Sequence, residues 1–331
     1  MKLDKLKFAT RLNSFSARPE LYWTEGYKPT TLDLLKRAGK TVGLNAVDLN
    51  YPDHLDGFSD STLRDVLADT QLGLNGLQMR YYSGSTFTAG GFAHPKKEVR
   101  EQAIELTLRG IDRMAQLGVN LMTLWLGQDG FDYPFQVDYQ RSWAHIIEGL
   151  SRVASYNPEI QISIEYKPNE PRAFSFLGDV GTTLLAIREV GLPNLGVTID
   201  FCHVLYADEQ PAFAASLVHQ HSQLLGLHLN DGYAKRDDGL MVGSVHLAST
   251  LELLCLVQDI DYQGIIYFDT FPHAEDPVAE CSTNIAVVKA LFGVATKLDR
   301  TALKTSQSQH DAVSSLRLLY GTLLPEFEKG G

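Results

Sequence analysis

Acidic and imidazole side chains follow four short apolar runs in the second half of the chain. The residues at or beside the ends of these runs are Glu165, Asp200, His228 and Asp269. Three carboxylates and an imidazole brought together would repel one another unless protons or a cation compensated them. Such oxygen-rich donors suit Mn²⁺, Mg²⁺ or Co²⁺, and Zn²⁺ also accepts them. Any one of these residues could instead cap a helix or hold a loop, but four in succession favour a divalent-metal site.

A second ion could bind beside the first. Asp200 and His203 are three residues apart, so both can face one ion where a strand turns into a loop, with Asp200 bridging. Asp237 and Asp238 lie in the stretch 232–242 and could complete this site with His203. The alternative for the Asp-Asp-Gly segment is a plain surface turn. We expect one metal site and favour a second.

Lys167 stands two residues past Glu165, so an extended chain places both side chains on the same side. A buried ammonium close to a metal can hydrogen-bond a substrate oxygen and offset charge that develops there. Lys167 is therefore a candidate catalytic residue. The alternative is an ion pair with Asp200 or Asp231, and Arg172 is expected to tie its loop to a neighbouring carboxylate.

Eight β-rich runs alternate with helical stretches along the chain. The predicted strands cover 7–13, 44–49, 74–81, 121–126, 161–166, 196–201, 225–229 and 265–269. The predicted helices cover 98–117, 142–154, 181–190, 209–220, 247–257 and 276–292. This alternation predicts a parallel sheet, and eight strands close a (β/α)₈ TIM barrel, whose chemistry lies at the C-terminal strand ends. An open doubly wound sheet is disfavoured, because 7–15 lacks the glycines of a phosphate loop.

The domain prediction is a barrel over 1–297 and a C-terminal helical extension over 298–331. We expect 305–309 to be a polar spacer and 312–327 to be one amphipathic helix with a broad apolar side. That side must pack on its own barrel or on a neighbouring subunit. The second option is slightly favoured, which predicts a homodimer or homotetramer.

Composition and net charge limit the classes of binding partner that we expect. The 331 residues carry 29 Lys and Arg against 40 Asp and Glu, a net charge of −11 without a basic block, which disfavours a nucleic-acid partner. The sequence contains no uncharged apolar run of about 18 residues, so it predicts no membrane span. The three cysteines are widely spaced and form no CxxC motif, so we expect neither a disulfide framework nor a cysteine zinc site. We expect a cytoplasmic location.

These motifs resemble those of a known family. Glu165-Tyr-Lys-Pro-Asn-Glu-Pro-Arg172 resembles the strand-five signature of xylose isomerases, and Asp200-x-x-His203 resembles their strand-six pair. The segment 227–231 with the acidic loop behind it resembles their strand-seven ligand region. Phe92 and Trp125 are similar to the aromatic residues that wall their sugar pocket. The resemblance covers the barrel in element order and is specific from about 90 to 270.

Four departures separate the chain from xylose isomerases proper. Asp200 replaces a longer glutamate, as in rhamnose isomerase and the ketose 3-epimerases. His228 stands where they have a carboxylate, as in rhamnose isomerase and the ketose 3-epimerases. Gly239 replaces a further loop aspartate. Their histidine after strand two has no counterpart in register here; Asp48 falls near its place, and His54 follows later.

The resemblance implies a metal-assisted aldose–ketose isomerase that shifts a hydride between C1 and C2 of a free sugar. Glu165, Asp200, His228 and Asp269 would hold one ion, and Asp200, His203, Asp237 and Asp238 a second. Lys167 would steady the C1 oxygen. The remaining expected substrate contacts are Trp125, Phe92, His203 and Asp48.

The alternative is a ketose 3-epimerase or cis-enediol isomerase. Such an enzyme needs one metal, with Glu165 and Asp269 as acid and base on the two faces of the sugar. The Asp-x-x-His pair and the Asp-Asp loop favour the two-metal isomerase, whereas His228 and Gly239 favour the epimerase. A metal-dependent nuclease on a similar barrel is disfavoured by the net charge, and a barrel that binds sugar without turnover remains open.

Overall fold

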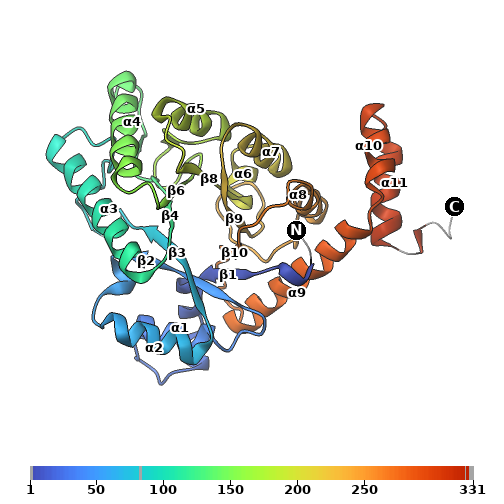
Figure 1. Ribbon diagram of the computed structural model, residues 1–331, viewed down its shortest axis with the longest axis horizontal. Coiled ribbons are helices and arrows are strands. Elements are labelled where there is room, and N and C mark those ends of the chain that lie inside the picture. Colours follow the sequence, from blue (N-terminus) through green and yellow to red (C-terminus); the bar gives the residue numbers. More distant parts are fainter. Residues whose placement is uncertain (1–2, 82–83, 325, 328–331) are drawn as a thin grey trace.

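The predicted barrel is confirmed. A computed structural model describes residues 3–81, 84–324 and 326–327, and Figure 1 shows its barrel within a ring of helices. The strands are β1 (Phe8–Arg11), β2 (Ala46–Tyr51), β3 (Gly73–Met79), β4 (Leu121–Leu124), β6 (Gln161–Glu165), β8 (Leu195–Asp200), β9 (Leu224–Leu229) and β10 (Ile266–Phe268). All neighbours pair in parallel, and β10 closes on β1.

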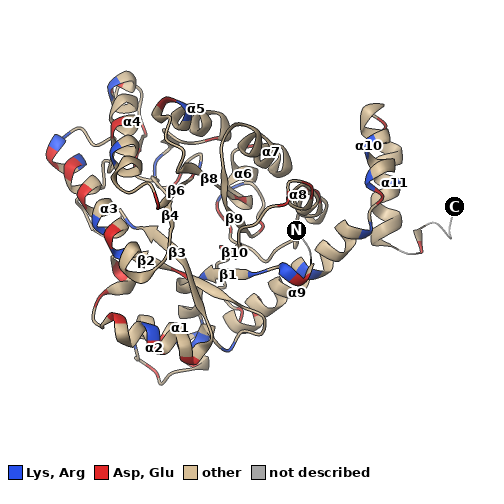
Figure 2. Ribbon diagram, viewed as in Figure 1, with Lys and Arg blue, Asp and Glu red and all other residues tan. Residues whose placement is uncertain are grey.

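The helices cover the outside of the barrel. They are α1 (Thr31–Ala38), α2 (Asp60–Thr70), α3 (Lys97–Leu117), α4 (Tyr139–Tyr156), α5 (Val180–Val190), α6 (Phe201–Tyr206), α7 (Pro211–His221), α8 (Leu247–Asp259) and α9 (Pro277–Lys297). Helix α3 buries Ala103, Ile104, Ile111 and Met114, and ends as predicted at Gly118, whose φ of 74° is in the left-handed region. Its outer side carries Lys and Arg interspersed with Asp and Glu (Figure 2).

Sequence analysis gave no helix for α1 or α2. Helix α1 has eight residues and begins with a capping box, in which Thr30 and Asp33 satisfy each other's backbone N–H groups. Helix α2 has two buried residues, Leu63 and Val66. Such short apolar stripes give a weak periodic signal, and the tertiary contact with the barrel decides the helix.

Alternation along the strands aims the polar residues into the barrel. Side chains two residues apart share a face of a strand, so Ser163 and Glu165 point inward together, as do Thr198 and Asp200. On β9, Gly226 lies below His228, and a Cβ there would lie 2.3 Å from Oγ1 of Thr198. The glycine therefore lets β8 and β9 pack closely beneath the polar rim.

A short antiparallel pair, β5 (Gly130–Phe131) and β7 (Phe174–Ser175), lies outside the barrel sheet. Arg172 ties this pair down, because its Nε donates to Oδ2 of Asp132 at 2.9 Å. This confirms the expectation that Arg172 holds its loop to a carboxylate.

The C-terminal segment forms an arm of two helices, α10 (Arg300–Ser308) and α11 (Ala312–Leu323). The prediction of a polar spacer over 305–309 is wrong for 305–308. Those residues continue a helix that begins at Asp299, whose carboxylate accepts hydrogen bonds from the N–H groups of Thr301 and Ala302 at 2.9 Å. The predicted helix over 312–327 ends at Leu323, and residue 325 lies outside the described part of the chain.

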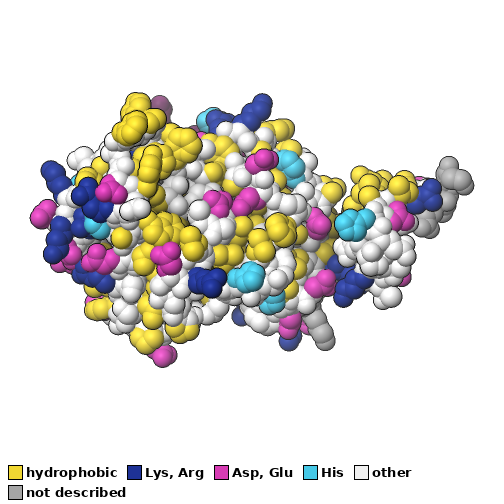
Figure 3. Space-filling model, turned by 90° about the horizontal axis from the view of Figure 1, so that it is seen from above, with side chains coloured by type: hydrophobic (Ala, Val, Ile, Leu, Met, Phe, Trp, Pro, Cys, Tyr) yellow, Lys and Arg dark blue, Asp and Glu magenta, His cyan; other side chains and the backbone are white. Residues whose placement is uncertain are grey.

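The arm projects from the barrel beyond the end of α9, and hydrophobic side chains lie on its surface (Figures 1 and 3). Val313 is 66% exposed and Leu316 is 48% exposed. Among the helices of the described ranges, α9 alone has the length and apolar composition of a membrane span. Its Val288, Phe292 and Ala295 are buried in the core, however, so one side of α9 belongs to the barrel.

Candidate active site

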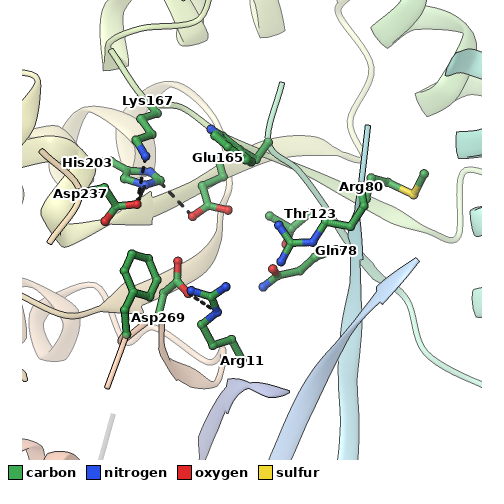
Figure 4. Close-up of a pocket in the computed structure, with 12 residues that line it drawn as sticks. Arg11, Gln78, Arg80, Thr123, Glu165, Lys167, His203, Asp237 and Asp269 are labelled. Carbon is green, nitrogen blue, oxygen red and sulfur yellow. Dashed lines mark hydrogen bonds and ion pairs between the residues drawn. The ribbon is translucent and has the colours of Figure 1, made fainter. Parts of the chain in front are cut away.

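A cavity of about 260 Å³ opens at the C-terminal ends of the strands (Figure 4). This volume is close to the lower end of small-molecule sites, roughly 300 Å³. The lining residues are Arg11, Gln78, Met79, Arg80, Thr123, Trp125, Glu165, Lys167, His203, Asp237, Asp269 and Phe271. The cavity therefore suits a small polar molecule and lies where (β/α)₈ enzymes place their chemistry.

The four predicted ligands of the first ion meet at this rim. One donor atom from each of Glu165, Asp200, His228 and Asp269 lies within 4.8 Å of all the others. Strand pairing produces this arrangement, because Asp200 and His228 are register partners on β8 and β9. The His228 ring also packs on Tyr267, with ring centroids 4.2 Å apart.

Glu165 and His228 are directly paired, with 3.1 Å between Glu165 Oε1 and His228 Nδ1. Burial alone would raise the pKa of Glu165, but the charge and hydrogen bond of His228 outweigh it and hold the pKa at about 2. For His228, burial lowers the pKa, but the Glu165 carboxylate raises it to about 9. Glu165 is thus an anion that demands a positive partner.

The pKa values of Asp200 and Asp269 are shifted upward, in contrast to that of Glu165. Burial and the neighbouring carboxylates raise the pKa of Asp200 to about 7, against the attraction of His203. Burial also raises the pKa of Asp269, although Arg11 opposes it. The protein groups alone therefore leave too little positive charge for all three carboxylates, and a proton or a cation must supply the rest.

This donor set fits a divalent ion. Ligands on opposite sides of an ion with bonds of about 2.0–2.6 Å are about 4–5 Å apart, which matches the observed spread of the four donor atoms. Three carboxylates and one imidazole also have the donor types that Mn²⁺, Mg²⁺, Co²⁺ and Zn²⁺ accept. The residues present therefore fit the first predicted metal site.

His203 and Asp237 form a second group of donors beside the first. His203 Nδ1 lies 3.0 Å from the backbone carbonyl of Tyr166, which can only accept, so Nδ1 carries the hydrogen. His203 Nε2 faces Asp237 Oδ2 at 3.2 Å. Burial would lower the pKa of His203, but Asp200 and Asp237 raise it to about 10, so a positive charge is favoured at this point.

An unsatisfied oxygen supports a cation near this pair. Asp237 Oδ1 is buried and accepts no hydrogen bond from the described residues. A buried carboxylate oxygen without a partner is costly, and a bound cation would remove that cost. A metal-ligating histidine usually donates a hydrogen bond from its other ring nitrogen, as His203 Nδ1 does here, so Nε2, which faces Asp237, would be the ligand atom.

The structure does not bring Asp238 to this group. Its Oδ1 accepts from Nε of Arg236 at 2.8 Å, and its Oδ2 accepts from the N–H of Tyr233 at 2.9 Å. Both oxygens are therefore engaged within the loop. The expectation that Asp238 binds the second ion finds no support in this arrangement.

Lys167 lines the cavity and is buried, as its proposed role requires. Its Nζ lies 3.0 Å from both Asp237 Oδ2 and Glu170 Oε2, rather than pairing with Asp200 or Asp231. Burial would lower the pKa of Lys167, but these two carboxylates raise it, so the ammonium stays charged. The Trp125 ring, 5.4 Å from Nζ, forms the adjacent wall.

Two expected substrate contacts lie elsewhere. Phe92 is fully buried, packs against Tyr81 with ring centroids 5.7 Å apart, and fills the space that Gly149 leaves on α4. Asp48 is buried in β2, where its Oδ1 accepts from Asn75 Nδ2 at 2.8 Å. Neither residue lines the cavity, so this geometry does not support their assignment as substrate contacts, which stays a prediction.

Sequence reasoning missed the opposite side of the cavity. Arg11 ends β1, Gln78 lies near the end of β3, and Arg80 follows β3. The prediction of strands over 7–13 and 74–81 already placed these residues at the functional ends, which was the available signal. Asn230 was also missed as a support: its Nδ2 donates to both oxygens of Asp200, at 3.2 and 3.0 Å.

Comparisons with known proteins agree with the fold. The chain is 27% identical over 212 residues to a xylose isomerase of Thermus thermophilus, covering 62% of this chain and 55% of that protein. It is 25% identical over 300 residues to a probable sugar isomerase of Rhizobium meliloti, covering 88% of this chain and 64% of that protein. The matched segment thus spans between half and two thirds of these relatives' length.

Solved structures share the fold at low sequence identity. A xylose isomerase domain protein from Alicyclobacillus acidocaldarius has a TM-score of 0.66 at 16% identity, covering 88% of this chain and 99% of that one. A 3-keto-D-glucoside 4-epimerase from E. coli has a TM-score of 0.64 at 14% identity, covering 86% of this chain and all of the other. The family model described as xylose isomerase-like TIM barrel matches residues 36–291. The chain therefore belongs to the xylose isomerase-like TIM barrel family.

Proposed function

We propose that this protein is a divalent-metal-dependent sugar isomerase that interconverts an aldose and a ketose at C1 and C2. The observation that carries the proposal is the convergence of donor atoms from Glu165, Asp200, His228 and Asp269. Glu165 and Asp269 line one small cavity together with the buried Lys167. The names of the curated relatives, a xylose isomerase and a probable sugar isomerase, support the same reaction class.

The first ion would be held by these four residues, and a second by His203 and Asp237 with Asp200 between the two groups. Such ions supply Lewis acidity toward the oxygens of a bound sugar. Lys167 would donate a hydrogen bond to the oxygen at C1, since its charge is kept by Asp237 and Glu170. A pre-positioned ammonium in a water-poor site stabilises negative charge developing on that oxygen.

The walls of the cavity support a reaction that must exclude water. Trp125 lies beside Lys167, and Phe271 closes another side. These flat apolar surfaces can pack on the C–H face of a sugar while the polar rim holds its oxygens. A hydride that passes between neighbouring carbons is then shielded from solvent protons.

A second candidate function is a ketose epimerase with one ion. Two carboxylates whose pKa values are pushed in opposite directions are suited to act as base and acid, and here the pKa of Glu165 is lowered while that of Asp269 is raised. The solved D-tagatose 3-epimerase-like protein, with a TM-score of 0.62 at 16% identity, shares this fold. His228 also favours this branch by resemblance.

Turnover in D₂O separates the two candidates. Protein stripped with EDTA and reloaded with Mn²⁺ would be incubated with free pentoses, hexoses and 6-deoxyhexoses, and the products analysed by NMR. We expect an aldose and its ketose to interconvert without deuterium entering at C1 or C2. Ketose epimers carrying deuterium at the inverted carbon would establish the epimerase instead.

A double variant, His203→Asn with Asp237→Asn, extends the same experiment. The two-ion isomerase should lose activity with this change, whereas a one-ion epimerase should keep most of it. Absence of any turnover by protein with Mn²⁺ demonstrably bound would refute both candidates for the uncharged sugars in this panel.

A further inference from the structure

Two arginines line the cavity on the side away from Lys167. Arg11 reaches it from the end of β1 and Arg80 from the residue after β3, with Gln78 beside them (Figure 4). Strands β1 and β3 flank β2 in the barrel, so the two guanidinium groups approach the cavity from nearby strands. The proposed reaction at C1 and C2 assigns no role to either of them.

Arg11 contacts two residues that line the cavity, Asp269 and Phe271. Its Nε lies 3.4 Å from Asp269 Oδ1, which is beyond the usual distance for a charge-assisted hydrogen bond. Its guanidinium lies over the Phe271 ring at 4.5 Å from the centroid. Stacking of this kind is compatible with hydrogen bonds in the plane of the guanidinium group.

The positive potential of this side reaches a neighbouring histidine. Burial and the charges of Arg80 and Arg11 together lower the pKa of His54 to about 4, against the attraction of Asp53. A neutral sugar has no group that requires two guanidinium groups in a partly buried site. An anionic group does, because arginine binds carboxylate and phosphate through paired hydrogen bonds.

Arg11 also borders a neighbouring hollow. A second hollow of about 440 Å³ shares Arg11 and Phe271 with the cavity and is bordered by Arg18, Ser16 and His273. It lies between the loops that follow β1 and β10, at the same end of the barrel. A substrate longer than the cavity could therefore extend past Arg11 toward a third arginine.

We propose that the substrate is an acidic sugar, whose carboxylate or phosphate group lies far from the reacting carbons and is held by Arg11 and Arg80. This rests on the proposed sugar isomerase function and narrows its substrate class. The resemblance implied a free sugar, whereas the fold brings to one cavity two arginines that are 69 positions apart in the sequence.

The test compares three ketoses that differ only at C6: D-fructose, D-fructuronate and D-fructose 6-phosphate. The Mn²⁺-loaded protein would be assayed for turnover and, separately, for binding by calorimetry. We expect at least one of the anionic compounds to bind and to react roughly 10- to 100-fold better than D-fructose, mainly through a lower KM, because the charged group is remote from the reacting carbons.

Substitutions of single arginines show which of them contacts the anionic group of the ketose. Arg80→Met should reduce the preference for the anionic ketose about tenfold or more, Arg80→Lys should restore part of it, and Arg109→Met on the exposed side of α3 should change nothing. Loss of the preference in Arg18→Met as well would place a phosphate in the second hollow, whereas indifference to Arg18→Met would place a carboxylate between Arg11 and Arg80.

Different results would overturn the acidic-sugar inference and the isomerase proposal. Equal or better binding and turnover of D-fructose would overturn the acidic-sugar inference and leave the isomerase standing. Selective binding of an anionic ketose without turnover of any sugar would support the inference about recognition and refute the isomerase. Calorimetry that shows no difference among the three ketoses overturns the inference whatever the turnover.

Discussion

Asp200 caps the helix that carries His203. Its Oδ1 accepts a hydrogen bond from the backbone N–H of His203 at 2.9 Å, at the N-terminus of α6. The same carboxylate is one of the four grouped ligands, and Asn230 holds both of its oxygens. The position of the first candidate ion site is therefore tied through one side chain to the position of the second.

Replacing Asp200 by asparagine should separate capping from metal binding. Asparagine caps helices as well as aspartate, so α6 should remain in place. The amide lacks the negative charge, and the affinity for Mn²⁺ should fall by roughly 100-fold or more, since even outer partners of ligands cost about 10- to 100-fold. Calorimetric titration of Mn²⁺ into stripped protein measures this.

The stability of the stripped Asp200→Asn variant is its control. The pKa of Asp200 is raised to about 7, so its favourable contribution to folding is present at low pH and is lost as pH rises through 7. An amide does not ionise, and stripped Asp200→Asn protein at pH 8 should unfold at the same temperature as the parent or higher. Unchanged Mn²⁺ affinity would remove Asp200 from the ligand set.

Asp237 and Asp238 make a matched pair of variants in one loop. Asp237→Asn should lower the number of Mn²⁺ ions bound from two to one and reduce kcat, because Asp237 Oδ1 and Oδ2 face the site. Asp238→Asn should keep both ions, because its oxygens bind Arg236 and the N–H of Tyr233. Metal analysis after dialysis measures the ratio, and equal loss in both variants would argue against this assignment.

Asp237 and Asp238 also show what could not be predicted from the sequence. The period of two along β6, β8 and β9 was enough to place Glu165, Asp200 and His228 on the inner side of the barrel, and parallel pairing was enough to bring them to one rim. Asp237 and Asp238 are adjacent in a loop without a period. Only the loop's own hydrogen bonds decide which of the two faces the site.

Aromatic and basic residues were harder to place. Phe92 is equally compatible with a pocket wall and with the core, and it was assigned to the wall although it fills the gap beside Gly149. Arg11 and Arg80 belong to no local motif, and both line the cavity because β1, β2 and β3 are neighbours in the barrel sheet. Short motifs therefore indicated the candidate ion ligands, whereas the opposite wall required the three-dimensional structure.

Glu280 is a buried carboxyl that does not line the cavity, and it should make the stability of the protein depend on pH. Burial raises the pKa of Glu280 to about 7, although a hydrogen bond from Asn284 opposes it. The folded protein therefore keeps a proton that the unfolded chain loses above about pH 4.5. Glu280 should stabilise the protein fully below pH 4.5 and lose this contribution as pH rises to 7, beyond which the effect is constant.

The variant Glu280→Gln isolates this contribution. Glutamine cannot ionise, so the variant should gain stability relative to the parent between pH 4.5 and 7, as measured by urea unfolding of the stripped proteins. Glu105→Gln, at an exposed position on α3, is the control and should follow the parent. A parallel pH dependence of the parent and Glu280→Gln would show that Glu280 titrates normally.

The arm predicts self-association. A groove of about 940 Å³ separates α10 and α11 from α7 and α8, and apolar residues line both walls. Because the arm and the barrel face belong to one chain, two copies related by a twofold axis could each place an arm in the other's groove. The exposed Val313 and Leu316 on the arm, and Phe213 on the barrel, would then be covered.

Two substitutions on the arm test this arrangement. Val313→Asp with Leu316→Asp should convert a dimer or tetramer to monomers in light scattering, because each change would bury a charge in the apolar contact. Both side chains are largely exposed in the single chain, so the barrel should unfold at nearly the parent temperature. Arg317→Ala, on the same helix, should leave the mass unchanged. A parent protein that is already monomeric at micromolar concentration would contradict the prediction outright.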